Sequence, residues 1–165
     1  MQDRHGSAGY PVDQPTQALR TDHQFVRTLF DRYLNTDNVD VKKQAGPQIL
    51  MALEMHSRLE ETVFYPRVRD TDPSLIGEFE DAHQQVDQMV AQLKTMDEGD
   101  PQCDALMQQL CDAVMRHVDT EEQQLFPKVE GAGLDMTALG LEMQAFEASI
   151  ISGQARAMEQ KDMRT

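Results

Sequence analysis

The sequence predicts an all-α fold, an antiparallel up-and-down four-helix bundle with an additional C-terminal helix. Apolar residues recur at alternating spacings of three and four along several long segments, the pattern of helices that bury one face. No segment of useful length alternates apolar and polar residues as a half-buried strand would. The chain also carries one motif twice, which indicates a duplicated helix pair.

The first two helices of the predicted bundle each have an apolar face that contains a histidine. The first helix is expected over residues 16–34, and its inward face is Leu19, His23, Val26, Phe30 and Tyr33. The second extends to about Arg69, with Asp40 as a candidate cap and Pro47 as an early kink or a late start. Its inward face is Ile49, Leu53, His56, Glu60 and Val63.

Asp-Pro pairs begin the next two helices, because Asp caps a helix and Pro suits its first turn. The third helix begins at Asp72-Pro73, ends at Glu98-Gly99, and has an inward face of Ile76, Phe79, His83, Val86, Val90 and Leu93. The fourth begins at Asp100-Pro101, ends at Pro127 and the glycines after it, and has an inward face of Leu106, Leu110, Ala113, His117 and Glu121.

These elements divide the chain into three parts. Residues 1–15 are a flexible arm, residues 16–130 form the bundle, and residues 135–160 form the C-terminal helix. Asp135 can cap this last helix. Its face of Leu139, Met143, Phe146 and Ile150 is expected to pack on the bundle or at a homodimer interface.

Composition restricts the classes of partner. The formal net charge of −14 argues against nucleic acid and against an anionic membrane surface, both of which require basic patches. No apolar run approaches the length of a membrane span, and the N-terminus lacks the apolar segment of a signal peptide. Cys103 and Cys111 are eight residues apart on one helix, too far for a disulfide. We therefore expect a cytoplasmic protein.

The duplicated motif contains pairs of residues that can bind metal. Residues 56–66 and 117–127 both read His-x-x-x-Glu-Glu-x-x-apolar-aromatic-Pro. The His and the first Glu lie four residues apart and share one helix face. A single copy would be read more simply as a surface ion pair, but two copies that share every one of these positions favour a metal site.

The duplication extends to a histidine on the helix before each motif. His23 lies 33 residues before His56, and His83 lies 34 before His117. A lone inward histidine is usually a satisfied core residue, but here all four bundle helices carry one. Burying these groups without a partner would cost several kcal/mol per ionised group, which a shared metal offsets. The predicted ligands are His23, His56, Glu60, His83, His117 and Glu121.

Six ligands without cysteine exceed a tetrahedral zinc site and divide into two groups. His23 and His56 can serve one metal, and the histidines of the second copy can serve the other, with both glutamates as bridges. Mixed nitrogen and oxygen ligation suits iron or manganese. Open positions on such metals are where O2, NO or peroxide can bind.

This pattern resembles the hemerythrin-like, or HHE cation-binding, domains, and the resemblance covers residues 16–130. It implies a four-helix bundle around two iron ions with an oxo or hydroxo bridge; manganese and zinc are alternatives. The oxygen-carrying hemerythrins have a further histidine one turn after the third-helix histidine, where this chain has Asp87. We expect Asp87 to face outward or to contact a ligand rather than to bind metal.

Three further residues near the motif are ambiguous. Glu61 and Glu122 follow the bridging glutamates and point about 100° away from them, so a solvated face or a contact to a ligand is favoured over metal binding. Tyr65 lies near the site and can donate a hydrogen bond or bind iron, although core packing is the favoured interpretation.

Two classes of function fit these residues. A binding protein would hold or sense O2, NO or iron without turnover, and the chain carries no phosphate loop, serine elbow or Cys-x-x-Cys motif that would indicate other chemistry. An enzyme would disproportionate peroxide or oxidise ferrous iron at the same centre. Related domains in iron–sulfur repair proteins share the four-His, two-Glu set but carry an N-terminal cysteine module that this sequence lacks. The sequence leaves open whether the chain is an enzyme.

Overall fold

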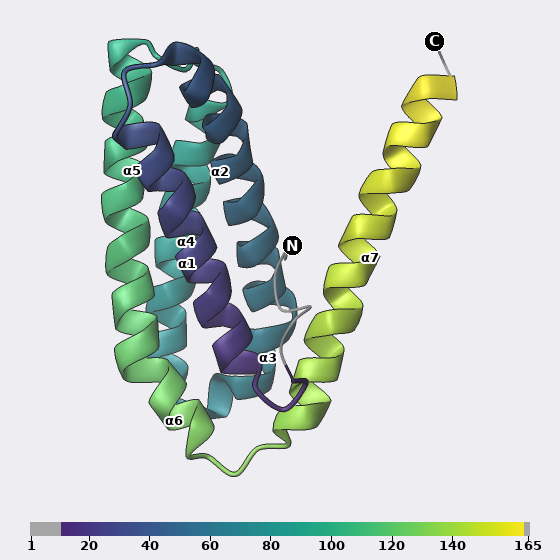
Figure 1. Cartoon of the computed structure of the whole chain (residues 1–165). Coiled ribbons are helices and arrows are strands. Elements are labelled where there is room, and N and C mark those ends of the chain that lie inside the picture. The colour runs from purple at the N-terminus through teal and green to yellow at the C-terminus, as the bar shows by residue number, and fades with distance from the viewer. Residues whose placement is uncertain (1–10, 164–165) are drawn as a thin grey trace.

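Four long helices form the core of the fold, in a computed structural model that describes residues 11–163 and the side chains of residues 11–153. They are α1 (Pro15–Leu34), α2 (Val39–Leu59), α4 (Pro73–Leu93) and α5 (Pro101–Thr120) (Figure 1). Consecutive helices run antiparallel, and α1 also packs on α5 while α2 packs on α4. Residues 11–163 contain no strand, so the predicted all-α bundle is confirmed. Of the predicted arm, residues 1–10 lie outside the described part.

The starts of α2 and α4 follow from short polar side chains. The side chain of Asn38 accepts hydrogen bonds from two backbone N–H groups, so Asn38 and not Asp40 caps α2. Because α2 begins at Val39 and continues through Pro47, the late start considered for this helix is wrong. Asp72 caps α4 as predicted, by accepting a hydrogen bond from the backbone of Leu75 at 3.1 Å.

The connection between α4 and α5 differs from the prediction in two respects. The helix α4 ends at Leu93, before the predicted Glu98-Gly99, because the intervening residues form turns. Gly99 lies in these turns with a φ of 95°, a conformation that glycine adopts readily. Asp100 precedes α5 as predicted, but its side chain makes no capping hydrogen bond.

Both motif copies interrupt their helix with a wider turn. The π-helical segments η2 (Glu60–Phe64) and η4 (Glu121–Leu125) follow α2 and α5 directly. Short helical pieces complete each copy, namely α3 (Tyr65–Val68) with the 3-10 turn η3 (Arg69–Thr71), and α6 (Phe126–Glu130). The sequence had predicted uninterrupted α-helix at both places.

The buried apolar side chains form two clusters. One is built mainly from α1, α2, α4 and α5, and includes Phe30, Ile49, Val90 and Leu110. The other is built around η2, η4 and the first turns of α4, and includes Leu59, Phe64, Ile76 and Phe126. The inward face of α5 is broader than predicted because it packs on both α4 and α1: Met107, Val114 and Val118 are buried, while Leu106 and Ala113 are half-buried.

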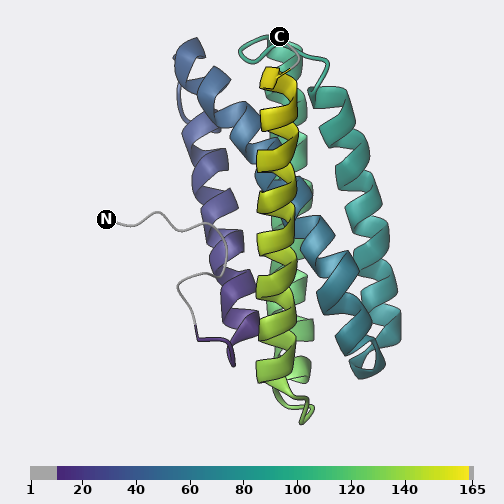
Figure 2. The ribbon, with the colours of Figure 1, turned by 90° about the vertical axis from the view of Figure 1, so that its right-hand side faces the viewer.

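The C-terminal helix α7 (Met136–Met163) lies against one side of the bundle (Figure 2). Asp135 accepts a hydrogen bond from the backbone of Ala138, and Leu139 and Met143 join the second apolar cluster. A Cβ at Gly140 would lie 1.8 Å from the carbonyl oxygen of Val12, so only glycine permits this close contact between residue 12 and α7. The homodimer considered for this helix stays a prediction.

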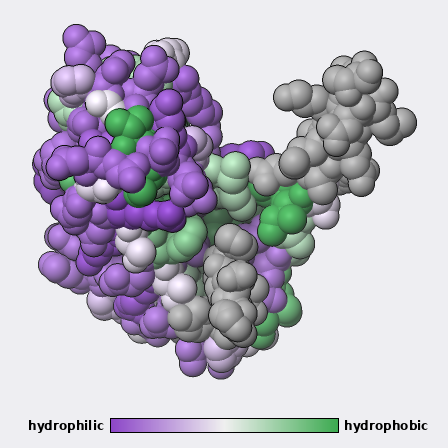
Figure 3. All heavy atoms as spheres, turned by 45° about the horizontal axis from the view of Figure 1, so that its top comes forward, coloured by the Kyte–Doolittle hydropathy of each residue, from purple (hydrophilic) through white to green (hydrophobic). Residues whose placement is uncertain are grey.

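The far half of α7 diverges from the bundle (Figure 1). The surface of the bundle is mostly hydrophilic in the view of Figure 3, and apolar side chains gather beside the diverging part. Leu141 and Ile151 on this helix are exposed. Among residues 11–163, no helix is long and apolar enough to cross a membrane.

We expect Leu110→Ala to lower the free energy of unfolding by about 2–5 kcal/mol, because it removes a fully buried side chain and leaves a cavity. The matched control is Leu141→Ala, which changes a leucine that is 54% exposed and should alter the same quantity by less than about 0.5 kcal/mol. Denaturant unfolding of the metal-free variants measures both. Equal losses in the two variants would contradict the placement of the core.

Candidate metal centre

The six residues predicted as ligands come together in the middle of the bundle, between the two apolar clusters. Each is supplied by a different element, and their donor atoms form two groups in which all atoms lie within 4.8 Å of one another. His23, His83 and both glutamates are buried, and the two glutamates have no exposed surface. The members are His23 on α1, His56 on α2, Glu60 on η2, His83 on α4, His117 on α5 and Glu121 on η4.

The four imidazoles form two pairs. The Nε2 atoms of His23 and His56 are 3.1 Å apart, and those of His83 and His117 are also 3.1 Å apart. We call the first pair position 1 and the second pair position 2. Each pair joins the two histidines of one half of the duplicated bundle, α1 with α2 and α4 with α5, as the sequence predicts.

The two carboxylates span these pairs. Oε1 of Glu60 lies 3.4 Å from Nε2 of His56 and 3.2 Å from Nε2 of His83. Glu121 does the same with its two oxygens, since Oε1 lies 3.1 Å from Nε2 of His23 and Oε2 lies 3.7 Å from Nε2 of His117. Each carboxylate is therefore within reach of both positions.

The π-helical turns aim additional side chains at the site. In each, the backbone N–H of the aromatic residue donates to the carbonyl of the glutamate five residues earlier. Residues five apart on an α-helix point about 140° from each other, but a wider turn brings them closer to one face. The sequence signal for this turn is the proline after each aromatic residue, which has no N–H to continue the α-helical bonding.

Tyr65 is one of the residues that η2 turns inward. Its ring has no exposed surface, and its hydroxyl donates a 2.6 Å hydrogen bond to Oε2 of Glu121 and lies 3.2 Å from Oε1 of Glu60. Burial and the two carboxylates raise its pKa well above the usual value, so the phenol keeps its proton. Core packing, the interpretation favoured from the sequence, is thus incomplete. Phe126 occupies the same place in the second copy and stacks on His23.

Carboxylates outside the cluster hold three of the imidazoles by Nδ1. Glu122 lies 2.7 Å from Nδ1 of His23, and Glu61 lies 2.9 Å from Nδ1 of His83. Asp22 lies 3.3 Å from Nδ1 of His56. Such contacts fix the orientation of a ligating imidazole and leave Nε2 free for a metal. Glu61 and Glu122 therefore contact ligands, one of the two roles that the sequence favoured for them.

Asp22 was missed by the sequence interpretation. It belongs to α1, whereas the histidine it contacts belongs to α2, so no periodicity within one helix reveals the pair. Asp87 is exposed and lies outside both donor groups, as expected.

The donor set fits a metal. Oε2 of Glu60 and Nδ1 of His117 are buried without a hydrogen-bond partner, and the buried Oε1 of Glu121 faces Nε2 of His23 at 3.1 Å. Within the described part of the chain, the ion pairs of the six residues include no lysine or arginine. Facing imidazole nitrogens and unpartnered carboxylate oxygens require a positive charge between them, which two divalent or trivalent ions would supply. Metal binding by these six residues stays a prediction.

In the absence of metal, protons provide that positive charge. Burial alone would lower the pKa of His23, but hydrogen bonds to Glu121 and Glu122 outweigh it and raise the pKa. Burial is outweighed in the same way at His83, where Glu60 and Glu61 raise the pKa to about 9. At Glu60 burial raises the pKa, but the surrounding histidines outweigh burial and hold it well below its usual value. Burial and the charge of Glu60 raise the pKa of Glu121.

Metal uptake at pH 7 should therefore release protons, because the metal displaces those held by the imidazoles. The number released should fall as the pH is raised toward about 9, where His83 of the metal-free protein is already losing its proton. Calorimetry in two buffers of different ionisation enthalpy measures this number. Proton release that does not change between pH 7 and about pH 9 would contradict the assignment.

By the same linkage, the stabilisation that protonated His83 gives the metal-free fold is complete below pH 6.5 and is lost as the pH passes about 9.

Comparison with known proteins finds relatives in sequence and in fold. A relative from Nostoc sp. (strain PCC 7120 / SAG 25.82 / UTEX 2576), described as a DNA nickase, is 31% identical over 116 residues, which are 67% of this chain and 32% of that protein. The chain thus spans about a third of the length of this curated relative. A crystal structure of a hemerythrin HHE cation binding domain-containing protein from Mycobacterium kansasii has a TM-score of 0.68 at 21% identity, over 89% of this chain and 90% of that one.

The family described as Hemerythrin HHE cation binding domain matches residues 14–129. These residues contain both motif copies, all six clustered side chains and the whole of the four-helix bundle. The resemblance seen in the sequence is confirmed: the chain belongs to the hemerythrin HHE cation-binding domain family.

Proposed function

We propose that this cation-binding chain is a non-haem di-iron protein that binds or senses O2 or NO, or holds iron, without turnover. The observation that carries the proposal is the pair of buried carboxylates that each reach both imidazole pairs. Imidazole and carboxylate ligands together suit iron, with manganese or zinc as alternatives. Two iron ions would supply redox chemistry toward O2, NO or peroxide, and the residues of the chain decide which of these can approach.

A small cavity beside the imidazoles restricts the ligand. Its volume is about 20 Å³, and its lining combines the four histidines with Val26, Leu53, Ser57, Val86, Val114 and Val118. A space of this size holds about one water-sized molecule. Because the walls are mostly apolar, they favour a small uncharged molecule and keep bulk water away from the positions between the histidines. This supports a diatomic ligand over an organic substrate.

Peroxide disproportionation or ferrous oxidation is the second candidate, and Tyr65 is the observation that favours it. A protonated phenol lies against both carboxylates and 3.5 Å from Nε2 of His117. Peroxide chemistry develops charge on oxygen at the site, and this hydroxyl is positioned to donate a hydrogen bond there.

Two further proposals concern location and partners. Cys103 and Cys111 are both free, which fits a reducing cytoplasm. We propose that this chain, unlike the cyanobacterial relative described as a nickase, has no nucleic-acid partner, because a net charge of −14 disfavours contact with DNA.

Loss of one bridging carboxylate should weaken both metals. We expect Glu60→Ala to lower iron bound per chain at both positions together, since Oε1 of Glu60 lies within 3.4 Å of an imidazole of each pair. Iron per chain after anaerobic loading with ferrous iron and gel filtration measures this. Glu78→Ala, which changes an exposed glutamate on α4, is the control and should bind as the wild type does. Loss of only one iron would contradict the bridging role.

Optical spectra separate the two candidate functions. A binding protein should form a stable adduct when the reduced, iron-loaded protein meets O2 or NO, and should consume peroxide no faster than free iron in the same buffer. Peroxide loss well above that rate, together with oxygen evolution, would establish the enzyme instead. Tyr65→Phe copies the residue found at the same place in the second motif, and should slow peroxide loss only if the hydroxyl of Tyr65 takes part in the reaction.

A further inference from the structure

The two halves of the duplicated bundle agree at the inner ligands but differ in the residues behind them. From these differences we infer that the two metal positions are unequal: position 1 retains its metal, whereas position 2 exchanges its metal through a groove between α2 and α4. The inference rests on the two-metal function proposed above. It assigns different roles to two positions that the ligand set alone leaves equivalent.

The first difference lies behind the histidine of each motif. In the first half, Asp22 precedes His23 and contacts Nδ1 of His56 at 3.3 Å. In the second half, Ala82 precedes His83, and Nδ1 of His117 is buried without a hydrogen-bond partner. A carboxylate on the outer nitrogen fixes the tautomer and increases the basicity of a ligating imidazole, and its loss commonly weakens metal binding by about 10- to 100-fold. Position 1 is supported by such a carboxylate at both histidines, and position 2 at one.

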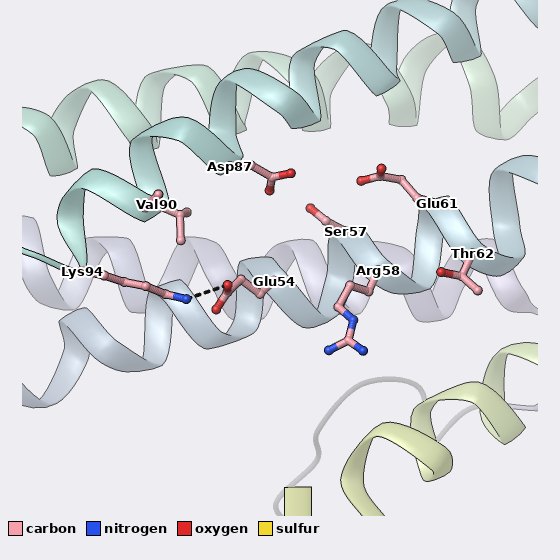
Figure 4. Close-up of a pocket in the computed structure, with 9 residues that line it drawn as sticks. Glu54, Ser57, Arg58, Glu61, Thr62, Asp87, Val90 and Lys94 are labelled. Atoms are coloured by element: carbon pink, nitrogen blue, oxygen red, sulfur yellow. Dashed lines mark hydrogen bonds and ion pairs between the residues drawn. The ribbon is translucent and has the colours of Figure 1, made fainter. Parts of the chain in front are cut away.

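The second difference is access from solvent. A groove of about 480 Å³ lies between α2 and α4, which carry His56 and His83, and Figure 4 shows Ser57, Glu61 and Asp87 pointing toward one another across it. Counted from the histidine of each helix, the corresponding face between α5 and α1 has Val118 in place of Ser57 and Arg27 in place of Asp87. Val118 is buried, and Arg27 reaches Asp119 at 4.0 Å.

Ser57 joins the groove to the centre. It lines both the groove and the small cavity that contains the four histidines. Its side chain is buried, with 8% of the residue exposed. A hydroxyl at this boundary can give its oxygen to a passing ion or water.

The charges of the groove suit a cation. Lys94 is occupied by Glu54 at 2.7 Å, and the guanidinium of Arg58 points away from Asp87 and Glu61 (Figure 4). No basic side chain therefore neutralises Asp87 within the described residues. Glu61 lies at the groove and also 2.9 Å from Nδ1 of His83, so its carboxylate connects the groove to position 2. A divalent metal ion entering here meets carboxylates before it meets the imidazoles.

Variants that retain one position each test the difference in affinity. His117→Ala leaves position 1 complete, and His56→Ala leaves position 2 complete. Titrated with Co²⁺, whose visible absorption reports binding, the first variant should bind about 10- to 100-fold more tightly than the second. Asp22→Ala added to the first should weaken binding, and Ala82→Asp added to the second should strengthen it, a gain that damage to the fold cannot produce.

The wild type provides a second measurement that does not depend on those variants. Release of two Co²⁺ ions to an excess of chelator should show a fast and a slow phase of equal size. Ser57→Val and Asp87→Arg copy the corresponding residues of α5 and α1 and should each slow the fast phase by about 10-fold or more, because the first closes the groove and the second reverses its charge. Glu78→Gln is the control and should leave both phases unchanged.

The outcomes separate this inference from the function on which it rests. Fewer than two Co²⁺ bound per wild-type chain would overturn the two-metal function. Two ions bound with equal affinity in the single-position variants, or released in a single phase that Ser57→Val and Asp87→Arg do not slow, would overturn the inference and leave the two-metal function intact.

Discussion

Two carboxylates and four imidazoles lie together at the centre of this bundle, with apolar side chains above and below them. Neither Glu60 nor Glu121 has exposed surface, and an ionised carboxylate in such a place is costly unless a positive charge lies beside it. Protonated imidazoles compensate the charge when metal is absent, which is why the pKa of His83 is raised while that of Glu60 is lowered. A metal ion can replace these protons because it contacts the same nitrogen and oxygen atoms.

Helix geometry explains how six such groups converge. An α-helix presents a residue to the centre every three or four positions, so each helix can supply a histidine and, one turn later, a glutamate. The π-helical turns then add to the centre a side chain five residues after each glutamate, which a regular α-helix would point elsewhere. They bring the aromatic residue that follows each glutamate toward the same centre, as the hydroxyl of Tyr65 on Glu121 and the ring of Phe126 on His23 show.

The duplication accounts for the symmetry of the inner residues and for the asymmetry of the outer ones. Inner ligands in both halves meet the same buried point, so the same residue types serve there. Outer residues of the two halves meet different surroundings: Asp22 is near Nδ1 of His56, whereas Ala82 leaves Nδ1 of His117 without a partner. A bundle built from two copies of one plan can thus contain two metal positions that differ in affinity and access.

The sequence by itself determined the all-α fold, the approximate positions of the helices and the six inward polar residues. These follow from periodicity and from a motif that occurs twice, both of which are local properties of the chain. The caps were less certain: Asp72 was predicted correctly, whereas Asn38 caps α2 in place of Asp40. A cap depends on one hydrogen bond, and neighbouring polar residues compete for it.

Only the tertiary structure decided which groups meet across helices. Asp22 contacts His56, and Tyr65 reaches Glu121, although each pair is far apart in the chain. The groove is formed between α2 and α4, and its shape depends on side chains of both helices. Periodicity reports the direction in which a side chain points from its own helix. The distance to a side chain on another helix depends on how the helices pack, and no single segment of sequence contains that information.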